Sequence, residues 1–587
     1  MQNLSYSFLD KKIIIRIKNR ICESSDELFD SALCRQVVTR CVKELAKRQS
    51  LLARPFGALD VTKDKIQVFI ETLRFLAKMD VDLVPKVVKG ADGFLKDKVL
   101  FNDLIEHLYN FWRSFDRFII CDSTGFDLDQ KPYRTFNTTI EHLMHLIRAT
   151  YRDIQENLTG FHPKIYRQVR SGASVAAIAQ GRPLWQGETF YAKLNAIAVM
   201  SQILLYPPLI LEPPMNKRTG KFERVMVNPL ERLTIDAKEW LGYPAKVGEL
   251  IILIYFHNKF AELGFSLCNL FELADEKDLT RPPDAVFCYG VPRRLVEGLG
   301  ASPTVFFDDE ENQLLVGAIP EDDEFGYFGY LKKMVLTLHN IVMMKRGRLP
   351  YHGAMVRVIL KGGRAATILM IGDTGAGKSE TLEAFRAIGQ DEIQDLIIIA
   401  DDMGSLQIDS QGQIIGYGTE TGAFLRVDDL KPGYAFGQID RAIIMSPSKI
   451  NARIILPVTT FNNVIQGFGV DMVLYVNNYE DVDDDHPVIE RLKDKDQAMN
   501  VFREGTVMSK GTTTTTGIVH SYYANVFGPP QYKDLHEKLA QKYFTAIFKK
   551  NIFVGQMRTR LGLPGYEQSG PAEAARQLLA LIRGNNR

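Results

Sequence analysis

The stretch Thr367-Ile-Leu-Met-Ile-Gly372-Asp-Thr-Gly-Ala-Gly-Lys378-Ser379 is the most informative part of this 587-residue sequence. Its second half fits G-x-x-x-x-G-K-[ST], the P-loop pattern. In such a loop, backbone N–H groups surround a phosphate chain, the lysine reaches the terminal phosphates and the hydroxyl binds Mg²⁺. The apolar run before the glycines suits a buried strand, and Glu380 to Phe385 consists of good helix formers. The stretch therefore predicts a phosphate-binding loop between a strand and a helix N-terminus.

Two aspartates follow the next apolar run, Leu396-Ile-Ile-Ile-Ala400. Asp401 or Asp402, at the C-terminal end of a strand, can reach a metal ion held by Ser379. Alone, the pair would more simply end a strand in a polar turn, but next to a P-loop we expect a metal ligand. The residues assigned to nucleotide binding are consecutive: Gly372, Asp373, Thr374, Gly375, Ala376, Gly377, Lys378, Ser379 and Glu380.

Composition narrows the class of protein without naming a function. The chain is too long for a single core, so two or more domains are expected. A formal net charge of +1 gives no long-range attraction to nucleic acid or to an anionic membrane. The longest apolar patch, Leu194 to Leu211, is broken by Pro207-Pro208, and the six cysteines form no C-x-x-C pair. We expect a cytoplasmic protein with neither a nucleic-acid nor a membrane partner.

The hydrophobic pattern divides the chain into three regions. Residues 1–160 are expected to be a helical N-terminal region, residues 161–300 a mixed α/β region, and residues 301–587 the P-loop nucleotide-binding catalytic domain. In the first region, apolar residues keep helical spacing from Ile66 to Leu76 and from Ile140 to Ile154. Thr138 and Glu141 suggest a capping box before the second set.

The last region carries most of the predicted strands. A helix is expected from Tyr330 to Lys345, and a Lys361-Gly-Gly turn should join the P-loop strand to the strand before it. Such a hairpin differs from the usual parallel P-loop sheet. The expected strands are 304–307, 314–317, 355–360, 367–371, 396–400, 453–457 and 472–476.

Further residues of the types used in phosphoryl transfer precede the P-loop. Tyr327-Phe-Gly-Tyr-Leu-Lys332-Lys333 supplies two lysines, and His352 lies 19 residues beyond Lys333. Taken singly, such lysines are usually solvated and such a histidine is usually structural. Together they resemble the superfamily of phosphoenolpyruvate carboxykinase and HPr kinase, in which a Y-x-G-x-x-K-K-G-M segment lies about 19 residues ahead of a histidine, with the P-loop soon after.

The resemblance implies a set of roles for these residues. It implies a Mn²⁺ ion held by Lys333 as a neutral amine, by His352 and by Asp402, with Lys378 and Ser379 holding phosphates and Mg²⁺. Asn451-Ala-Arg453 resembles the N-T-R segment whose arginine contacts the transferred phosphate and the substrate, and Glu420-Thr-Gly422 resembles E-G-G. The catalytic residues are then Lys332, Lys333, Lys378, Arg453 and Asp401, and the substrate-binding residues are Tyr327, Arg453 and, as a weaker candidate, Arg170.

Two departures from the carboxykinase pattern leave alternatives open. Gly-Lys-Ser-Glu380 and His352-Gly353 are closer to HPr kinase, and Lys510 to Gly517 replaces the carboxykinase nucleotide segment. The donor could therefore be ATP, GTP or pyrophosphate.

Three functions fit these motifs. The first is the interconversion of oxaloacetate and a phosphoryl donor with phosphoenolpyruvate and CO₂. The second is an HPr-kinase-like transfer to a protein serine or a small-molecule hydroxyl, with Asp401 or Asp402 as base. The third is a non-catalytic nucleotide-binding regulator. For fold, we expect an α/β protein whose helix-rich N-terminal region precedes a mixed-sheet P-loop domain of the carboxykinase type.

Overall fold

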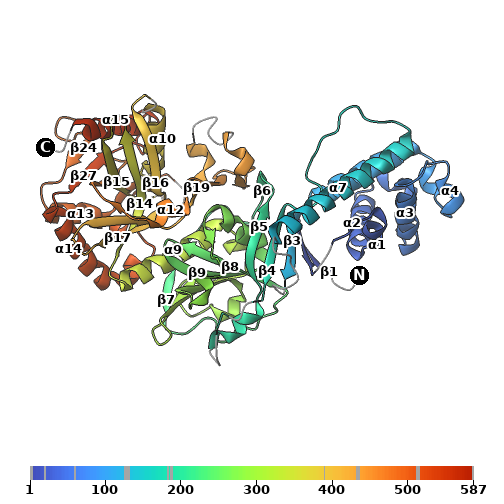
Figure 1. The fold of residues 1–587 in the computed structure, drawn as a ribbon, viewed down its shortest axis with the longest axis horizontal. Helices are drawn as coiled ribbons and strands as arrows, with labels where there is room; N and C mark the ends of the chain where they lie inside the picture. Colours follow the sequence, from blue (N-terminus) through green and yellow to red (C-terminus); the bar gives the residue numbers. More distant parts are fainter. Residues whose placement is uncertain are drawn as a thin grey trace. The chain divides into compact units, whose positions relative to one another are not determined.

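Helices and mixed sheets occur throughout the chain, which confirms the α/β class (Figure 1). The computed structural model describes residues 4–18, 21–57, 61–123, 132–181, 184–185, 190–373, 375–388, 391–430, 437–510 and 516–584. The chain forms two units. The first comprises Met1–Gly181 with Met200–Tyr206, and the second comprises Arg182–Val199 with Pro207–Arg587.

The first unit contains a sheet with the order β1-β2-β3-β4-β5. Strands β1 and β2 form an antiparallel hairpin, and β3 and β4 continue the sheet in parallel. The bounds are β1 Leu4–Leu9, β2 Lys12–Ile17, β3 Asp116–Ser123, β4 Val175–Gln180 and β5 Val199–Leu205. The region that we expected to be helical thus also supplies strands. β2 is a short β-branched run, which favours a strand but shows no clear period.

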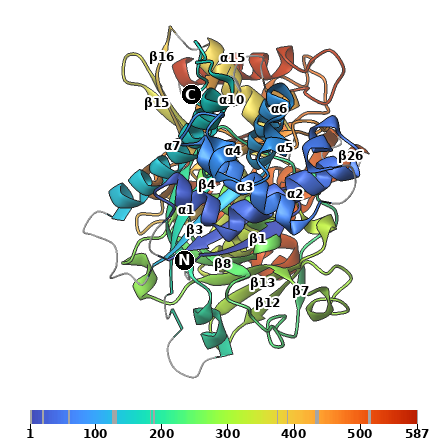
Figure 2. The same cartoon turned by 90° about the vertical axis from the view of Figure 1, so that its right-hand side faces the viewer.

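The helices of the first unit lie close together (Figures 1 and 2). A cluster of phenylalanines forms part of the core between them. The two predicted helices are confirmed as α3 and α7. The capping box at Thr138 is wrong, because α7 begins at Pro132. The helix bounds are α1 Ser25–Asp30, α2 Ala32–Lys47, α3 Lys63–Leu76, α4 Val84–Val87, α5 Asp92–Leu95, α6 Lys98–Arg113 and α7 Pro132–Thr159.

The second unit contains a sheet with the order β8-β9-β11-β13-β12-β7, in which β10 also pairs with β8. β9, β11 and β13 are parallel, whereas β8 and β12 are antiparallel to their neighbours β9 and β13. The bounds are β7 Glu223–Val225, β8 Trp240–Val247, β9 Leu250–His257, β10 Glu272–Leu273, β11 Ala285–Val291, β12 Val305–Asp309 and β13 Leu314–Pro320.

A nine-stranded sheet of the second unit carries the P-loop. Its order is β22-β18-β17-β14-β15-β23-β27-β24, with β16 paired to β14. The predicted hairpin is confirmed, because β14 pairs antiparallel with β15 across the glycine turn. The bounds are β14 Leu349–Leu360, β15 Ala365–Ile371, β16 Ile393–Ala400, β17 Met403–Ile408, β18 Ile414–Gly418, β22 Phe468–Gly469, β23 Met472–Asn477, β24 Ile489–Arg491 and β27 Phe553–Arg558.

Helix α9 (Phe328–Lys345) lies between these two sheets and contacts strands of both. Almost all of its residues are buried, because a helix covered on opposite sides must be apolar around its whole circumference. The helix begins at the predicted Tyr327-Phe-Gly-Tyr-Leu-Lys332-Lys333 segment. Because α9 is packed between the two sheets, the directions of the Lys332 and Lys333 side chains are fixed by the helix.

Smaller elements complete the second unit. A four-stranded sheet has the order β19-β21-β20-β6, and β25 pairs with β26. Their bounds are β6 Leu209–Leu211, β19 Gly422–Arg426, β20 Ile443–Met445, β21 Arg453–Pro457, β25 Thr506–Lys510 and β26 Thr516–His520. The remaining helices are α8 Ala261–Ser266, α10 Lys378–Ile388, α12 Phe461–Ile465, α13 Lys495–Glu504, α14 Lys533–Lys549 and α15 Ser569–Gly584.

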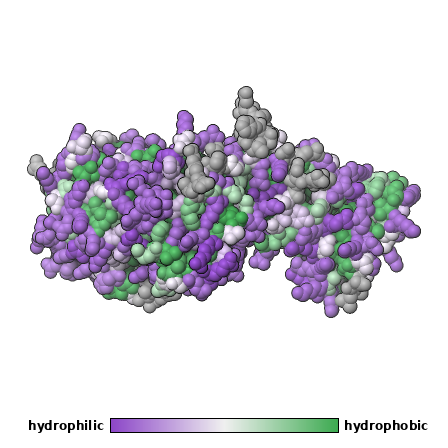
Figure 3. All heavy atoms as spheres, turned by 90° about the horizontal axis from the view of Figure 1, so that it is seen from below, coloured by the Kyte–Doolittle hydropathy of each residue, from purple (hydrophilic) through white to green (hydrophobic). Residues whose placement is uncertain are grey.

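The surface is mostly hydrophilic on the face that Figure 3 presents, and hydrophobic residues there form small separate patches. Among the helices of the described residues, we find none with both the length and the apolar character needed to cross a bilayer.

Candidate active site

The P-loop connects β15 to α10, as its motif predicts. Gly375 and Gly377 have φ values of 80° and 103°, which L side chains rarely adopt. A Cβ atom at Gly377 would also lie 2.7 Å from Oγ1 of Thr559. Lys378 is buried, and its Nζ donates to the carbonyls of Gly372 at 2.6 Å and Asp373 at 2.9 Å. The loop therefore holds its own lysine where a phosphate chain would be bound. Thr374 lies outside the described residues.

A cavity of about 480 Å³ opens over this loop. Several sequence-predicted residues line it together, while others come from segments that the sequence analysis did not single out. The charged residues of the wall are Arg218, Lys221, Lys332, Lys333, Asp373, Lys378, Glu380, Glu383, Asp401, Asp402, Arg426 and Arg453. Tyr327, Ser379, Phe424, His520 and Phe527 also line it. A wall with so many cations suits an anionic ligand.

The predicted metal ligands meet at the carboxylate of Asp402. Lys333 Nζ lies 2.7 Å from Oδ2, and His352 Nε2 lies 3.0 Å from Oδ1. Lys332 Nζ also lies 2.7 Å from Oδ2, and its other carboxylate partner is Glu420 at 3.3 Å. The structure thus brings together Lys332, Lys333, His352 and Asp402, which are scattered in the sequence.

Strand register explains this convergence. His352 in β14 pairs with Met403 in β17, and the backbone N–H of Gly353 donates to the carbonyl of Asp402 at 2.9 Å. Neighbouring strands lie about 4.8 Å apart, so the histidine and the aspartate must be adjacent. The two lysines reach the same point from the first turns of α9. A slip of one residue between β14 and β17 would turn His352 to the opposite face.

The two adjacent lysines have opposite pKa shifts. Burial alone would lower the pKa of Lys332, but attraction by Asp402 and Glu420 outweighs burial and raises it above its ordinary value. Burial lowers the pKa of Lys333, which is attracted by Asp402 and repelled by Lys332. Despite burial, these lysines hold the pKa of Asp402 well below its usual range. Lys333 is consequently the lysine that gives up its proton more readily.

The carbonyl of Ala524 fixes the tautomer of His352. His352 Nδ1 lies 2.6 Å from this carbonyl, which can only accept, so Nδ1 carries the proton. Burial, with repulsion by Lys333, lowers the pKa of His352 and so favours the neutral ring, whereas Asp402 acts in the opposite direction. Nε2 is then an acceptor that faces a carboxylate oxygen at 3.0 Å. Two acceptors at this distance repel each other unless a proton or a metal ion lies between them.

Arginines supply a second group of cations. Arg453 is buried in β21, its guanidinium lies 5.3 Å from the ring of Phe424, and its Nε has no hydrogen-bond partner among the described residues. Arg218 lies over the rings of Phe222 and Phe527 at 5.4 Å and 5.1 Å, and burial lowers its pKa. The sequence analysis missed Arg218. The only signal was the basic, glycine-containing segment Lys217-Arg-Thr-Gly-Lys221.

The other predicted residues have distinct positions. Tyr327 is the N-cap residue of α9 and is buried against Phe424. Glu420 is buried beside Lys332, and burial raises its pKa to about 7. Arg170 belongs to the first unit, where its guanidinium donates to the carbonyl of Tyr206, and it does not line this cavity. Within the described ranges, no three His, Cys, Asp or Glu side chains cluster as metal ligands, and the predicted set includes a lysine.

The site can thus bind a phosphate chain, hold a cation between His352 and Asp402, and surround an anionic substrate with arginines and lysines. No model of a known protein family matches this chain, and no curated protein matches it either.

Proposed function

We propose that the chain is a metal-dependent phosphoryl-transfer enzyme of the phosphoenolpyruvate carboxykinase type. It would interconvert oxaloacetate and a phosphoryl donor with phosphoenolpyruvate and CO₂. The observation that carries the proposal is the contact of Lys333 and His352 with the two oxygens of Asp402, beside the P-loop lysine. A kinase that acts on a hydroxyl has no evident use for a lysine in such a set.

The donor atoms around Asp402 fit a divalent transition metal. Lys333 offers an amine whose pKa is lowered, His352 offers the lone pair of Nε2, and Asp402 offers an ionised carboxylate. The nitrogen ligands suit a divalent transition metal and the carboxylate suits Mn²⁺ in particular, whereas the Ser379 hydroxyl beside bound phosphates suits Mg²⁺. When bound, the metal ions would supply Lewis-acid stabilisation of oxygen atoms that gain negative charge.

The chain's own residues would bind and orient the reactants. The P-loop and Lys378 would hold the phosphate chain of the donor, which is ATP, GTP or pyrophosphate. Arg453, with its unpaired Nε, and Arg218 would bind the carboxylate groups of oxaloacetate. Lys332 remains cationic because two carboxylates share it, so it can offset charge on the phosphoryl group in transit.

In the direction of phosphoenolpyruvate synthesis, the bond to the departing carboxylate breaks and CO₂ leaves. The electron pair remains on the enolate of pyruvate. The enolate oxygen then takes the terminal phosphoryl group of the donor, whose bridging P–O bond breaks, and ADP, GDP or inorganic phosphate leaves. Water must be kept from the enolate, since protonation would give pyruvate. The buried positions of Lys332, His352 and Arg453 fit this requirement.

The direct test is an assay of the purified chain with phosphoenolpyruvate, bicarbonate, Mn²⁺ and Mg²⁺. ADP, GDP or inorganic phosphate is offered in turn, and oxaloacetate is measured. We expect product with one of the three acceptors and none with the Lys378→Ala variant. If nucleotide binds but no acceptor gives oxaloacetate, the proposal is wrong.

Asp401 favours a second candidate, transfer to the hydroxyl of a protein serine or a small molecule. Burial, together with repulsion by Asp402, raises the pKa of Asp401, although Lys332, Lys378 and Lys333 attract its charge. Such a carboxylate is suited to act as a general base. Together with Gly-Lys-Ser-Glu380, it supports an HPr-kinase-like activity. Phosphorylation of a hydroxyl substrate that is lost in Asp401→Asn would establish this alternative.

A further inference from the structure

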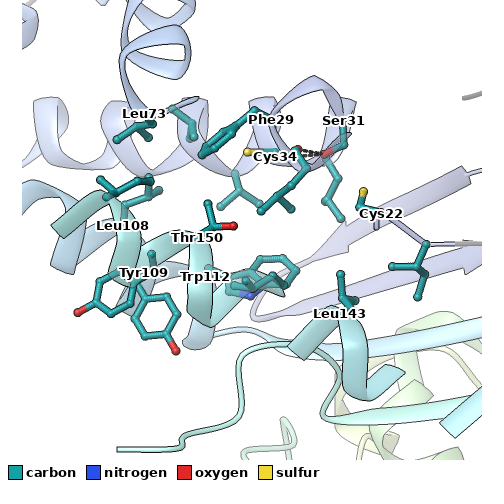
Figure 4. Close-up of a pocket in the computed structure, with 18 of the residues that line it drawn as sticks. Cys22, Phe29, Ser31, Cys34, Leu73, Leu108, Tyr109, Trp112, Leu143 and Thr150 are labelled. Atoms are coloured by element: carbon teal, nitrogen blue, oxygen red, sulfur yellow. Dashed lines mark hydrogen bonds between the residues drawn. The ribbon is translucent and has the colours of Figure 1, made fainter. Parts of the chain in front are cut away.

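The first unit contains a cavity of its own, of about 170 Å³, which the proposed reaction does not use (Figure 4). Side chains of β2, β3, α1, α2, α3, α6 and α7 line it. The wall is almost wholly apolar, and none of the described residues that line it is charged. It includes the aromatic rings of Phe29, Tyr109, Trp112 and Tyr151, of which the two tyrosines are stacked with centroids 4.0 Å apart.

One polar side chain in this wall stands out. Thr150 is 5% exposed and lines the cavity from the middle of α7, and Figure 4 shows it among the lining side chains, between Cys34 and Trp112. Elsewhere in helices, Thr72 and Thr159 donate to the carbonyl four residues earlier, at 2.7 Å and 2.8 Å. No hydrogen bond of this kind is found for the Thr150 hydroxyl among the described residues, and Thr150 is one of the few polar side chains that line the cavity.

These features define a small-molecule site. A hydroxyl that lines an apolar cavity and has no protein partner can be satisfied only by a ligand or a water molecule in that cavity. A water molecule needs two to four polar partners, and this wall offers few. For size, an apolar protein cavity of about 150 Å³ is large enough to bind benzene. We propose that the cavity binds a small, uncharged aromatic molecule that bears one hydroxyl group, which hydrogen-bonds to Thr150.

The wall supports each part of this description. Four aromatic rings favour an aromatic ligand through edge and face contacts. Because none of the described wall residues is charged, the site disfavours a carboxylate or an amine, whose unpaired charge would be costly to bury. Cys34, Leu33 and Cys22 are only partly buried, so this side of the cavity gives a ligand a way in. The inference is independent of the function proposed for the second unit.

Phenol and toluene are the probes for this site, because they have nearly the same shape and differ in one hydroxyl. Their binding to the full chain is measured by ligand-observed NMR and by the shift of the melting temperature. We expect both to bind, with phenol the tighter. In Thr150→Val, which keeps the shape of the side chain, phenol should lose about three- to tenfold in affinity, the usual worth of one neutral hydrogen bond. Toluene should bind as before.

Two further variants complete the test. Thr150→Leu adds volume inside the cavity and should abolish binding of both probes while the circular dichroism spectrum stays unchanged. Thr159→Val changes a threonine of the same helix that does not line the cavity, and it should bind both probes normally. The proposal is overturned if neither probe binds the parent chain, if Thr150→Leu binds as well as the parent, or if Thr150→Val leaves the preference for phenol intact.

Discussion

The substitution Asp402→Asn tests the charge cluster most directly, and it can be examined in metal-free protein. It removes one negative charge and keeps the size of the side chain. Lys332 retains Glu420 at 3.3 Å, but Lys333 loses the carboxylate that it contacts at 2.7 Å. The variant therefore leaves Lys333 buried without a carboxylate partner.

The magnitude follows from the burial of the lysines. Removal of one partner from a buried ion pair costs about 3–5 kcal/mol. We take the lower end, about 3 kcal/mol, because the Asp402 side chain is 16% exposed. The second unit has roughly 400 residues. The entropy of unfolding grows with the number of residues, so a loss of about 3 kcal/mol lowers the melting temperature of this unit by about 3–4 °C.

The loss of stability in Asp402→Asn, relative to the parent chain, should also depend on pH. In the variant, the pKa of Lys333 falls further below the value of an unfolded lysine, about 10.4. The unfolded chain then binds more protons than the folded chain between these two pKa values, so the stability of the variant rises with pH in that window. Lys332 acts in the same direction, because the loss of Asp402 also lowers its pKa. The difference from the parent should be larger at pH 7 than at pH 9.5.

Calorimetry at both pH values provides the measurement, and Asp401→Asn is the matched control. Asp401 is the neighbouring residue, but burial raises its pKa in spite of the attraction by Lys332, Lys378 and Lys333. Its replacement should leave the melting temperature unchanged or slightly raised. The interpretation fails if Asp402→Asn is no less stable than Asp401→Asn, or if its deficit is the same at the two pH values.

Three further predictions concern single side chains of the site. Arg218→Lys should raise KM for the carboxylate substrate at least tenfold and change kcat little, because lysine lacks the forked geometry that binds a carboxylate; an equal loss of kcat would contradict this role. His352→Ala should abolish the response of activity to Mn²⁺, and an unchanged metal titration would remove His352 from the ligand set. For Glu420, a folded pKa of about 7 exceeds the ordinary value of 4.5, so its ionisation costs stability as pH rises through this range. Glu420→Gln should lose less stability than the parent chain between pH 4.5 and 7, as melting curves across this range would show.

The elements around the P-loop could be predicted because their signals are local. A short apolar run, a glycine-rich turn and a run of helix formers lie within about twenty residues of one another, and each reflects the conformation of its own segment. The hairpin of β14 and β15 was predictable for the same reason, since its turn holds Gly362 and Gly363 with positive φ. The proximity of Lys333 and His352 was predicted only from the family resemblance, because local sequence patterns do not indicate which distant residues meet in the fold.

Long-range features could not be predicted in this way. Arg218 reaches the cavity from the connection between β6 and β7, and nothing near it in the sequence distinguishes it from a solvated arginine. The pairing of β2 with β3 joins segments about a hundred residues apart, and β2 is too short to show a period. Arg170 has the right chemistry, but the structure assigns it to the first unit.

The strained segment before Phe527 offers a reason for the geometry around His352. Tyr523 and Ala524 both have φ of 51°, an unfavourable conformation for residues other than glycine. Tyr522 holds this segment by hydrogen bonds to His536 and Glu537, and the Ala524 carbonyl thereby points at His352 Nδ1. Any buried histidine needs an acceptor for its N–H group. Here the acceptor is at Nδ1, which keeps the proton there and leaves the lone pair of Nε2 facing Asp402. The strain is therefore best understood as the cost of fixing one tautomer beside Asp402, which is the arrangement that the proposed metal site needs.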